Sequence, residues 1–292
     1  MLRFAGFLFV AMLSWFAPAF GQETGDLDAL RAAMLTAVNG DRRAAGLAAL
    51  QDDPALNRAA QNHALDMARR SFYAHKTPEG KTVRDRYLAV GGDAWKIVGE
   101  NIARCKGCPD VPDLPAIERL QTGWMNSPPH RKNLLNPGFS SFGFGIAMAD
   151  GVEYAVQNFA GPGADQGTVL TLEEFRLAVL EQVNGLRDEA GRAPVEMSDD
   201  LSQAAQTAGE QPDINAILAE LNGQGEATWT VMSLARSRCG GCGRNPTSDD
   251  ASRLIAAMDK GTLTDAELTH AGIGFEADSS GRKQLTVLLG RR

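Results

Sequence analysis

Apolar residues recur at helical spacing in three stretches of the first half of the chain. In residues 27–45 they lie three and four positions apart, and Gly46 follows, so a helix is predicted to end there. A second helix is predicted over residues 53–71, because an aspartate that can cap it directly precedes a proline in the first turn. Residues 115–126 have helical spacing again.

Strand patterns dominate the segments between and after these helices. Residues 95–103 alternate as a strand does, and SSFGFGIAMADGVEYAVQNFAG contains two β-rich runs joined by Asp150-Gly151, a strong hairpin signal. Between them, Ser127 is predicted to cap a short helix that bears His130. Because helices come first and the sheet later, the pattern indicates an α+β fold with an antiparallel sheet.

The sequence repeats itself. VNGDRRAAGLAALQDDPALNRAAQ is matched 145 residues later by VNGLRDEAGRAPVEMSDDLSQAAQ, and WKIVGENIARCKGC is matched 134 residues later by WTVMSLARSRCGGC. Two tandem domains are therefore predicted, at residues 27–162 and 171–290. A linker at residues 163–170, rich in glycine and next to a proline, joins them.

The second copy lacks the positions that carry chemistry in the first. The offset between copies falls from 145 to 134 residues across the segment around His75, and to 129 across the segment around His130. Glu100 falls opposite Leu234. Residues 171–290 are thus predicted to be a degenerate copy that keeps the frame without the site.

Composition and the first residues bound the class of protein. The 292 residues are 43% hydrophobic and 22% charged, and 29 Lys+Arg against 36 Asp+Glu give a net charge of −7, which argues against binding nucleic acid. MLRFAGFLFVAMLSWFAPAFGQ has the pattern of a signal peptide over residues 1–21, with cleavage after Ala19 or an uncleaved anchor as alternatives. No later segment is apolar enough to cross a bilayer, so an exported protein, periplasmic or extracellular, is predicted.

Four cysteines occur as two CxxC pairs, Cys105 with Cys108 and Cys239 with Cys242. Two local disulfides are favoured, because paired cysteines oxidise outside the cytoplasm and each copy carries its own pair. A four-thiolate zinc site and a redox role are the alternatives.

The first copy resembles a known family in five separated elements. The elements, in the order found in the CAP superfamily, are FYAHKTPEG, GENIA, a tryptophan, SPPHRKNLL and a G-x-G strand. This superfamily includes the cysteine-rich secretory proteins, antigen five and the plant pathogenesis-related proteins of class one. The resemblance covers residues 27–162. It implies an α-β-α sandwich around an antiparallel sheet.

The resemblance also implies a cleft with two histidines and two acidic residues, in which the histidines can hold a divalent metal. By motif position the histidines are His75 and His130 and the first acid is Glu100, whereas Ser127 stands where the second acid is expected. The sequence departs from the family pattern there.

The three matching residues have workable metal chemistry. Two neutral imidazoles are good ligands for Zn²⁺ or another divalent ion, and a carboxylate either joins them or orients a ring. Arg131 and Asn133, next to His130, are candidates for fixing polar or anionic ligand groups or for holding the loop. Each residue alone has an ordinary structural interpretation, but their joint absence from the second copy favours a shared cleft.

Three functions fit this sequence. The leading hypothesis is an exported protein whose first domain binds a metal or a small-molecule, lipid or protein ligand without turnover, while the second domain is structural or binds a partner. The second is a metal-assisted hydrolase of peptide or envelope material with Glu100 as general base. The third is a non-catalytic adhesion or scaffold module.

Overall fold

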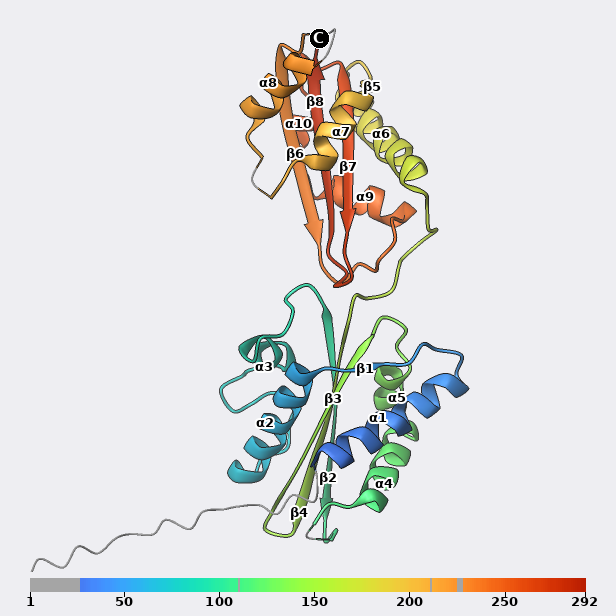
Figure 1. Cartoon of the computed structure of the whole chain (residues 1–292), viewed down its shortest axis with the longest axis vertical. Helices are drawn as coiled ribbons and strands as arrows, with labels where there is room; N and C mark the ends of the chain where they lie inside the picture. The colour runs from blue at the N-terminus through green and yellow to red at the C-terminus, as the bar shows by residue number, and fades with distance from the viewer. Residues whose placement is uncertain (1–26, 110, 211, 225–227) are drawn as a thin grey trace, which may run out of the picture.

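The protein is described by a computed structural model covering residues 27–109, 111–210, 212–224 and 228–292. The predicted signal peptide at residues 1–21 lies outside these residues. Along the chain, helices and strands build two four-stranded sheets, one in each half (Figure 1). The predicted α+β class is confirmed.

The first half contains one sheet with helices on both faces. Its strands are ordered β1-β3-β4-β2, with β1 parallel to β3 and the other pairs antiparallel. Helices α2 and α3 cover one face, and α1, α4 and α5 cover the other (Figure 1). The bounds are α1 Leu27–Ala44, β1 Gln51–Asp52, α2 Pro54–Arg70, α3 Val83–Ala89, β2 Ile97–Lys106, α4 Leu114–Met125, α5 Pro128–Leu134, β3 Ser141–Ala149 and β4 Val152–Gly161.

The second half has a sheet with the same pattern of pairing. Its order is β5-β7-β8-β6, again with one parallel and two antiparallel pairs. The bounds are α6 Leu172–Glu189, β5 Glu196–Met197, α7 Asp199–Thr207, α8 Ile214–Gln224, β6 Val231–Cys239, α9 Ser248–Ala256, α10 Lys260–Leu263, β7 His270–Ala277 and β8 Lys283–Arg291.

Local signals explain where the first-half elements begin and end. The Asp53 carboxylate accepts hydrogen bonds from the amides of Ala55 and Leu56 at the start of α2, as predicted. Asp150 and Gly151 take positive φ values of 50° and 70° at the β3–β4 turn, which is the geometry that the hairpin signal predicts.

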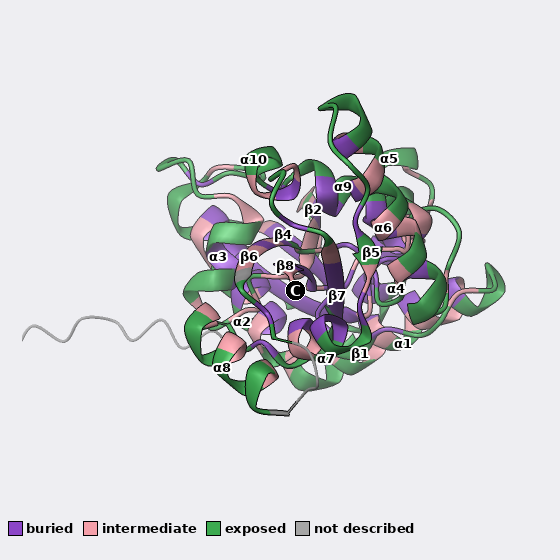
Figure 2. Ribbon diagram, turned by 90° about the horizontal axis from the view of Figure 1, so that it is seen from above, coloured by how far each residue is buried: buried purple, intermediate pink, exposed green. Residues whose placement is uncertain are grey.

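Two glycines of β3 set how closely α2 lies on the sheet. A Cβ on Gly143 would lie 2.3 Å from the Asn57 nitrogen, and one on Gly145 would lie 2.3 Å from the Gln61 nitrogen. Helix α2 therefore rests on the backbone of β3, while aromatic side chains fill the opposite face of the sheet. Purple core segments run through the centre of the molecule in Figure 2.

Candidate functional site

The site is built on the outer side of β2, which pairs with β4 alone among the described strands. Two outward-facing carbonyls of this strand receive side-chain donors. Asn133 Nδ2 donates to the Glu100 carbonyl at 3.0 Å, while Trp124 Nε1 and the Tyr73 hydroxyl each donate to the Ile102 carbonyl at 3.2 Å. These bonds satisfy an edge that would otherwise be open to another strand, and so fix the position of Glu100.

Glu100 is a buried carboxylate with a partner on each oxygen. Its side chain is 2% exposed, and its Oε1 lies 2.8 Å from His75 Nδ1. Its Oε2 accepts from the Arg86 guanidinium. Arg86 also donates to the carbonyls of His75 and Lys81, at 2.9 and 3.0 Å. One arginine therefore ties the loop that carries His75 to the strand that carries Glu100.

His75 is oriented by this carboxylate. The hydrogen bond to Glu100 raises the pKa of His75 above its ordinary value, against the opposing effect of burial. When the ring is neutral, Nδ1 donates to Glu100 and the lone pair lies on Nε2. The His75 side chain is 58% exposed, so the ring has access to solvent.

His130 lies in the first turn of α5, at the same side of the sheet edge. Its Nδ1 is 2.9 Å from Ser127 Oγ, and its carbonyl accepts from Asn101 Nδ2 at 3.2 Å. Burial lowers the pKa of His130, and the positive charge of His75 lowers it further. The charge of His75 thus acts on the His130 ring, and the shared cleft stays a prediction.

The remaining sequence candidates have different positions. Ser127 occupies the N-cap position of α5 but makes no side-chain capping bond, because its hydroxyl contacts His130 instead. The predicted side-chain cap is therefore wrong. Asn133 is structural, since its amide also bonds Asn101 Oδ1 at 2.9 Å.

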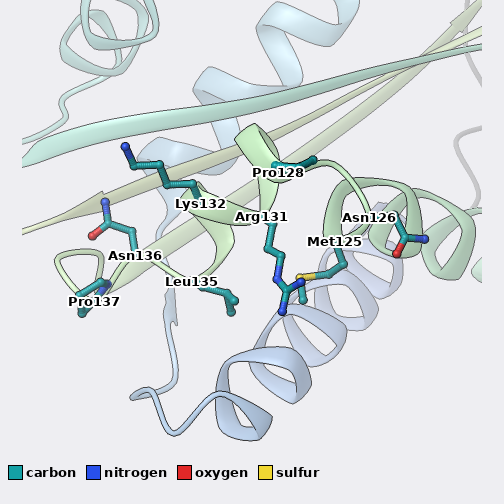
Figure 3. A pocket seen from close by; sticks show the side chains of 8 residues that line it. All are labelled: Met125, Asn126, Pro128, Arg131, Lys132, Leu135, Asn136 and Pro137. Atoms are coloured by element: carbon teal, nitrogen blue, oxygen red, sulfur yellow. The ribbon is translucent and has the colours of Figure 1, made fainter.

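Arg131 lines a separate hollow on the outer side of α5. This hollow of about 620 Å³ is bounded by α4, α5 and the segment after α5, and the Arg131 side chain extends toward Met125 (Figure 3). None of His75, Glu100 and His130 lines it. Arg131 is therefore not part of the histidine cleft.

Metal-ligand chemistry at the cleft rests on two imidazoles. Within the residues that the structure describes, no group of three or more His, Cys, Asp or Glu side chains is arranged to hold a metal ion. Both Glu100 oxygens are already bonded, so the available donors are the Nε2 atoms of His75 and His130.

Sequence reasoning missed Arg86, which comes from the seven-residue helix α3. A usable signal exists, because Arg86 falls in the same segment as His75, and the matching part of the second half is shorter. The helical run around His63 indicates an ordinary structural role for that residue. His63 is fully buried, and its Nε2 lies 3.0 Å from the Ala74 carbonyl, directly before His75.

Each CxxC pair closes on itself, as predicted. Disulfides join Cys105 to Cys108 and Cys239 to Cys242, with Cα atoms 5.8 and 6.2 Å apart. This pairing leaves no thiolate of these four for the alternative zinc site.

Comparison with known proteins agrees with the site. Residues 35–159 match the model of the cysteine-rich secretory protein family, CAP, and this range contains His75, Glu100 and His130. Residues 35–159 are therefore similar to a CAP domain, in line with the resemblance of residues 27–162, whereas the family match does not extend to the second half.

Two curated relatives of this chain are themselves uncharacterised. The chain is 31% identical over 143 residues to the uncharacterised protein YkwD of Bacillus subtilis, covering 47% of this chain and 52% of that one. It is 33% identical over 114 residues to the uncharacterised membrane protein YlbC of the same organism, covering 39% and 29%. The chain thus spans about half of one relative and under a third of the other.

Among solved structures, an extracellular protein containing an SCP domain from Bacillus anthracis is 30% identical, with a TM-score of 0.37, over 45% of this chain and 40% of that one. An outer surface protein of Borrelia burgdorferi is 21% identical, with a TM-score of 0.38, over 44% and 89%.

Proposed function

We propose that the CAP domain is a non-catalytic binding module, whose cleft takes a small polar ligand or a divalent metal ion between His75 and His130. The observation that carries this proposal is the state of Glu100. Its carboxylate is buried and bonded on both oxygens, so it acts as a positioning group that orients His75.

The same observation argues against the hydrolase hypothesis. A general base must reach the proton that it removes, either directly or through one water. Glu100 holds His75 on one oxygen and Arg86 on the other, and only 2% of its side chain is exposed. Releasing either partner would leave a buried charge unpaired, which is costly.

A bound Zn²⁺ would supply an electrophilic centre that attracts anionic or carbonyl groups of a ligand. His75 and His130 would hold it through their Nε2 atoms, and Glu100 and Ser127 would fix the rings from the other side. Two protein ligands are fewer than the three of most catalytic zinc sites, so weak binding completed by water or by a ligand is expected.

Residues 171–290 are proposed to be a second copy of the same domain, with a structural or partner-binding role. The matched contacts of two buried arginines support this. Arg42 and Arg187 are each 1% exposed and each donates to four backbone carbonyls. The acceptors are Ala48, Leu134, Asn136 and Phe139 for Arg42, and Ala193, Leu263, Asp265 and Leu268 for Arg187.

Corresponding acceptors in the two halves are separated by the offsets of the sequence repeat. The offset is 145 residues for the acceptor before the lost segments and 129 residues for the three acceptors after them. The correspondence therefore covers side-chain contacts as well as sheet order.

Export to the periplasm or the cell exterior is also proposed. The signal-peptide pattern at residues 1–21 and the two closed disulfides support it, because such bonds persist in oxidising compartments. In the part of the chain that the structure describes, no helix is both long and apolar enough to cross a bilayer.

The experiment is a calorimetric titration of Zn²⁺ into the metal-free chain starting at Gln22, compared with the double variant H75A/H130A. One-to-one binding that the double variant loses would support the cleft as a metal site. The matched control is H270A, since His270 lies in the second half and contacts Trp229.

Equal heats in the three proteins would remove metal from the proposal. The cleft would then be tested with vesicles and with peptide libraries, using the same variants. Zinc-dependent peptide hydrolysis that E100Q abolishes while binding persists would instead favour the hydrolase.

A further inference from the structure

A group of buried polar residues lies between Glu100 and α2, which we term the back cluster: His63, Arg86 and Asn158. Their exposed fractions are 0%, 8% and 0%. Among the described residues, His63 Nδ1, Arg86 Nε and both amide atoms of Asn158 have no hydrogen-bond partner. Burying four such atoms without hydrogen bonds would be unfavourable by several kcal/mol, so each is expected to have a partner.

The sheet register brings these residues to one place. Asn158 on β4 is the direct cross-strand neighbour of Glu100 on β2, so both side chains point to the same face. That face lies under α2, because Val156 and Ala160, which flank Asn158 at intervals of two, both pack in apolar clusters with α2 residues.

The other two members approach Glu100 from the helices. Arg86 binds the Glu100 carboxylate directly. His63 on α2 is close enough to Glu100 and Arg86 for both charges to act on its ring. All three residues therefore lie on one side of Glu100, whereas His75 meets it with a ring that is exposed to solvent.

A hollow of about 340 Å³ opens beside the back cluster. His63 and Arg86 line it together with Asn62, Leu65, Asp66 and Arg69. The hollow lies along the outer turns of α2 and shares no lining residue with the hollow next to α5. Two of the three residues of the back cluster, His63 and Arg86, therefore adjoin space at the surface.

The unpaired atoms specify the chemistry of what they hold. Because His63 Nε2 bonds the Ala74 carbonyl as a donor, its Nδ1 is an acceptor in the neutral ring, and burial lowers the pKa of His63 in favour of that form. Arg86 Nε is a donor only, and the Asn158 amide is both. The bound molecule must therefore both donate and accept hydrogen bonds, as a hydroxyl group does.

The second half lacks this group of residues entirely. Leu234 and Leu288 stand at the positions of Glu100 and Asn158, where they pair across β6 and β8 and pack against Trp229. Ala208 stands at the position of His63, and the segment with Arg86 is shortened. The positions of the back cluster are thus polar in the first half, which has Glu100, and they are apolar or lost in the second half.

We propose that the back cluster is a binding site for buried water, which enters from the α2-side hollow and hydrogen-bonds His63 Nδ1, Arg86 Nε and Asn158. Buried waters make about three such bonds to groups that otherwise lack partners. This site would place water beside the Arg86–Glu100 ion pair on the side of α2, and it does not depend on which ligand His75 and His130 take.

The first measurement is a high-resolution crystal structure of the mature chain. We expect ordered water within hydrogen-bonding distance of His63 Nδ1 and Arg86 Nε. Direct protein partners for these atoms, or no density between them, would overturn the proposal. This measurement needs no variant, so it does not depend on a substitution being tolerated.

The second measurement is urea unfolding of N158L, which introduces the residue found in the second half. If water is bound, removing the amide strands its remaining partners, and the midpoint should fall despite the added apolar volume. If the site is dry, replacing an unsatisfied amide by leucine should leave the midpoint unchanged or raise it, which would contradict the proposal.

Discussion

At the scale of single residues, the Arg86–Glu100 ion pair should dominate the stability of the site. Substituting Arg86 by Met leaves a carboxylate with a 2% exposed side chain without its cation, so we expect a loss of about 3–5 kcal/mol in the free energy of unfolding. Urea denaturation of R86M against the unchanged protein measures this.

The matched control is R70M. Arg70 pairs with Glu79 on the surface, where the side chains are 40% and 56% exposed, so R70M should lose far less stability than R86M. The double variant R86M/E100L, with the leucine of the second half, should recover part of the loss. Equal effects of R86M and R70M would contradict the assignment.

The two cleft histidines should titrate in a fixed order. Glu100 raises the pKa of His75, whereas burial and the charge of His75 lower that of His130, so His130 should lose its proton at lower pH. Because the folded pKa of His75 exceeds its ordinary value of 6.5, its contribution to stability is complete below that pH. It disappears as pH rises through the folded pKa.

Proton NMR of the imidazole resonances tests this order. E100Q should move the pKa of His75 down toward its ordinary value, and H75A should move that of His130 up. If the H75A substitution left the pKa of His130 unchanged, the two rings would not share one site.

The residues that sequence could predict are those held by motifs. His75, Glu100 and His130 are identified from short patterns. In the structure His75 bonds Glu100, and the carbonyl of His130 accepts from Asn101, the next residue of β2. Arg86 belongs to no motif, because its role depends on the position of α3 in the folded structure. The backbone permits a cap by the hydroxyl of Ser127, but His130 competes for that hydroxyl.

At the scale of elements, the close packing of α2 on β3 should leave no room for an added methyl group. A Cβ on Gly145 would lie 2.3 Å from a backbone atom of α2, so G145A should lose about 1–3 kcal/mol through overpacking. Thermal or urea unfolding measures it.

Gly123 supplies the opposite expectation. It lies in α4, and a methyl group added at its Cα would have no other atom within 4 Å, so G123A should gain up to about 1 kcal/mol through helix propensity. If both variants lost stability equally, the close approach of α2 would not be the cause.

Elements with strong local signals were predictable, and those without were not. Helices α1, α2 and α4 match the predicted ranges within one or two residues, because capping and turn residues mark their ends. Helix α3 was missed although Thr82 and Asp85 form a capping box, since seven residues are too few for a clear apolar period. Strand β2 begins two residues later and ends three residues later than predicted.

At the scale of the whole molecule, the two halves have separate apolar cores that share no residue. Their contact involves the second disulfide loop and the turn between β7 and β8. Gly240 and Gly241 lie against Trp95 and Ile97, and the Arg282 guanidinium is 5.7 Å from the centre of the Trp95 ring. The first disulfide loop has Lys106 in place of Gly240 but keeps Gly107 opposite Gly241, so only the glycine at position 240 is specific to the loop that makes this contact.

Because every hydrogen bond described for the cleft comes from the first half, residues 22–163 should fold alone and keep the site. We expect the pKa order of His75 and His130 in this fragment to equal that of the full chain. The new exposure of Trp95 and Ile97 should lower the thermal midpoint slightly, since each loses only its contact with the loop.

The matched fragment, residues 164–292, keeps Asp165, whose carboxylate accepts from the amides of Arg244 and Asn245 at 2.7 and 2.9 Å. It should also fold, because its core is complete without the first half. Calorimetric scans of both fragments and of the full chain decide the matter. Two transitions in the full chain that match those of the fragments would mean that the first half builds its candidate site unaided. A single transition with unfolded fragments would make the second half part of the folding unit.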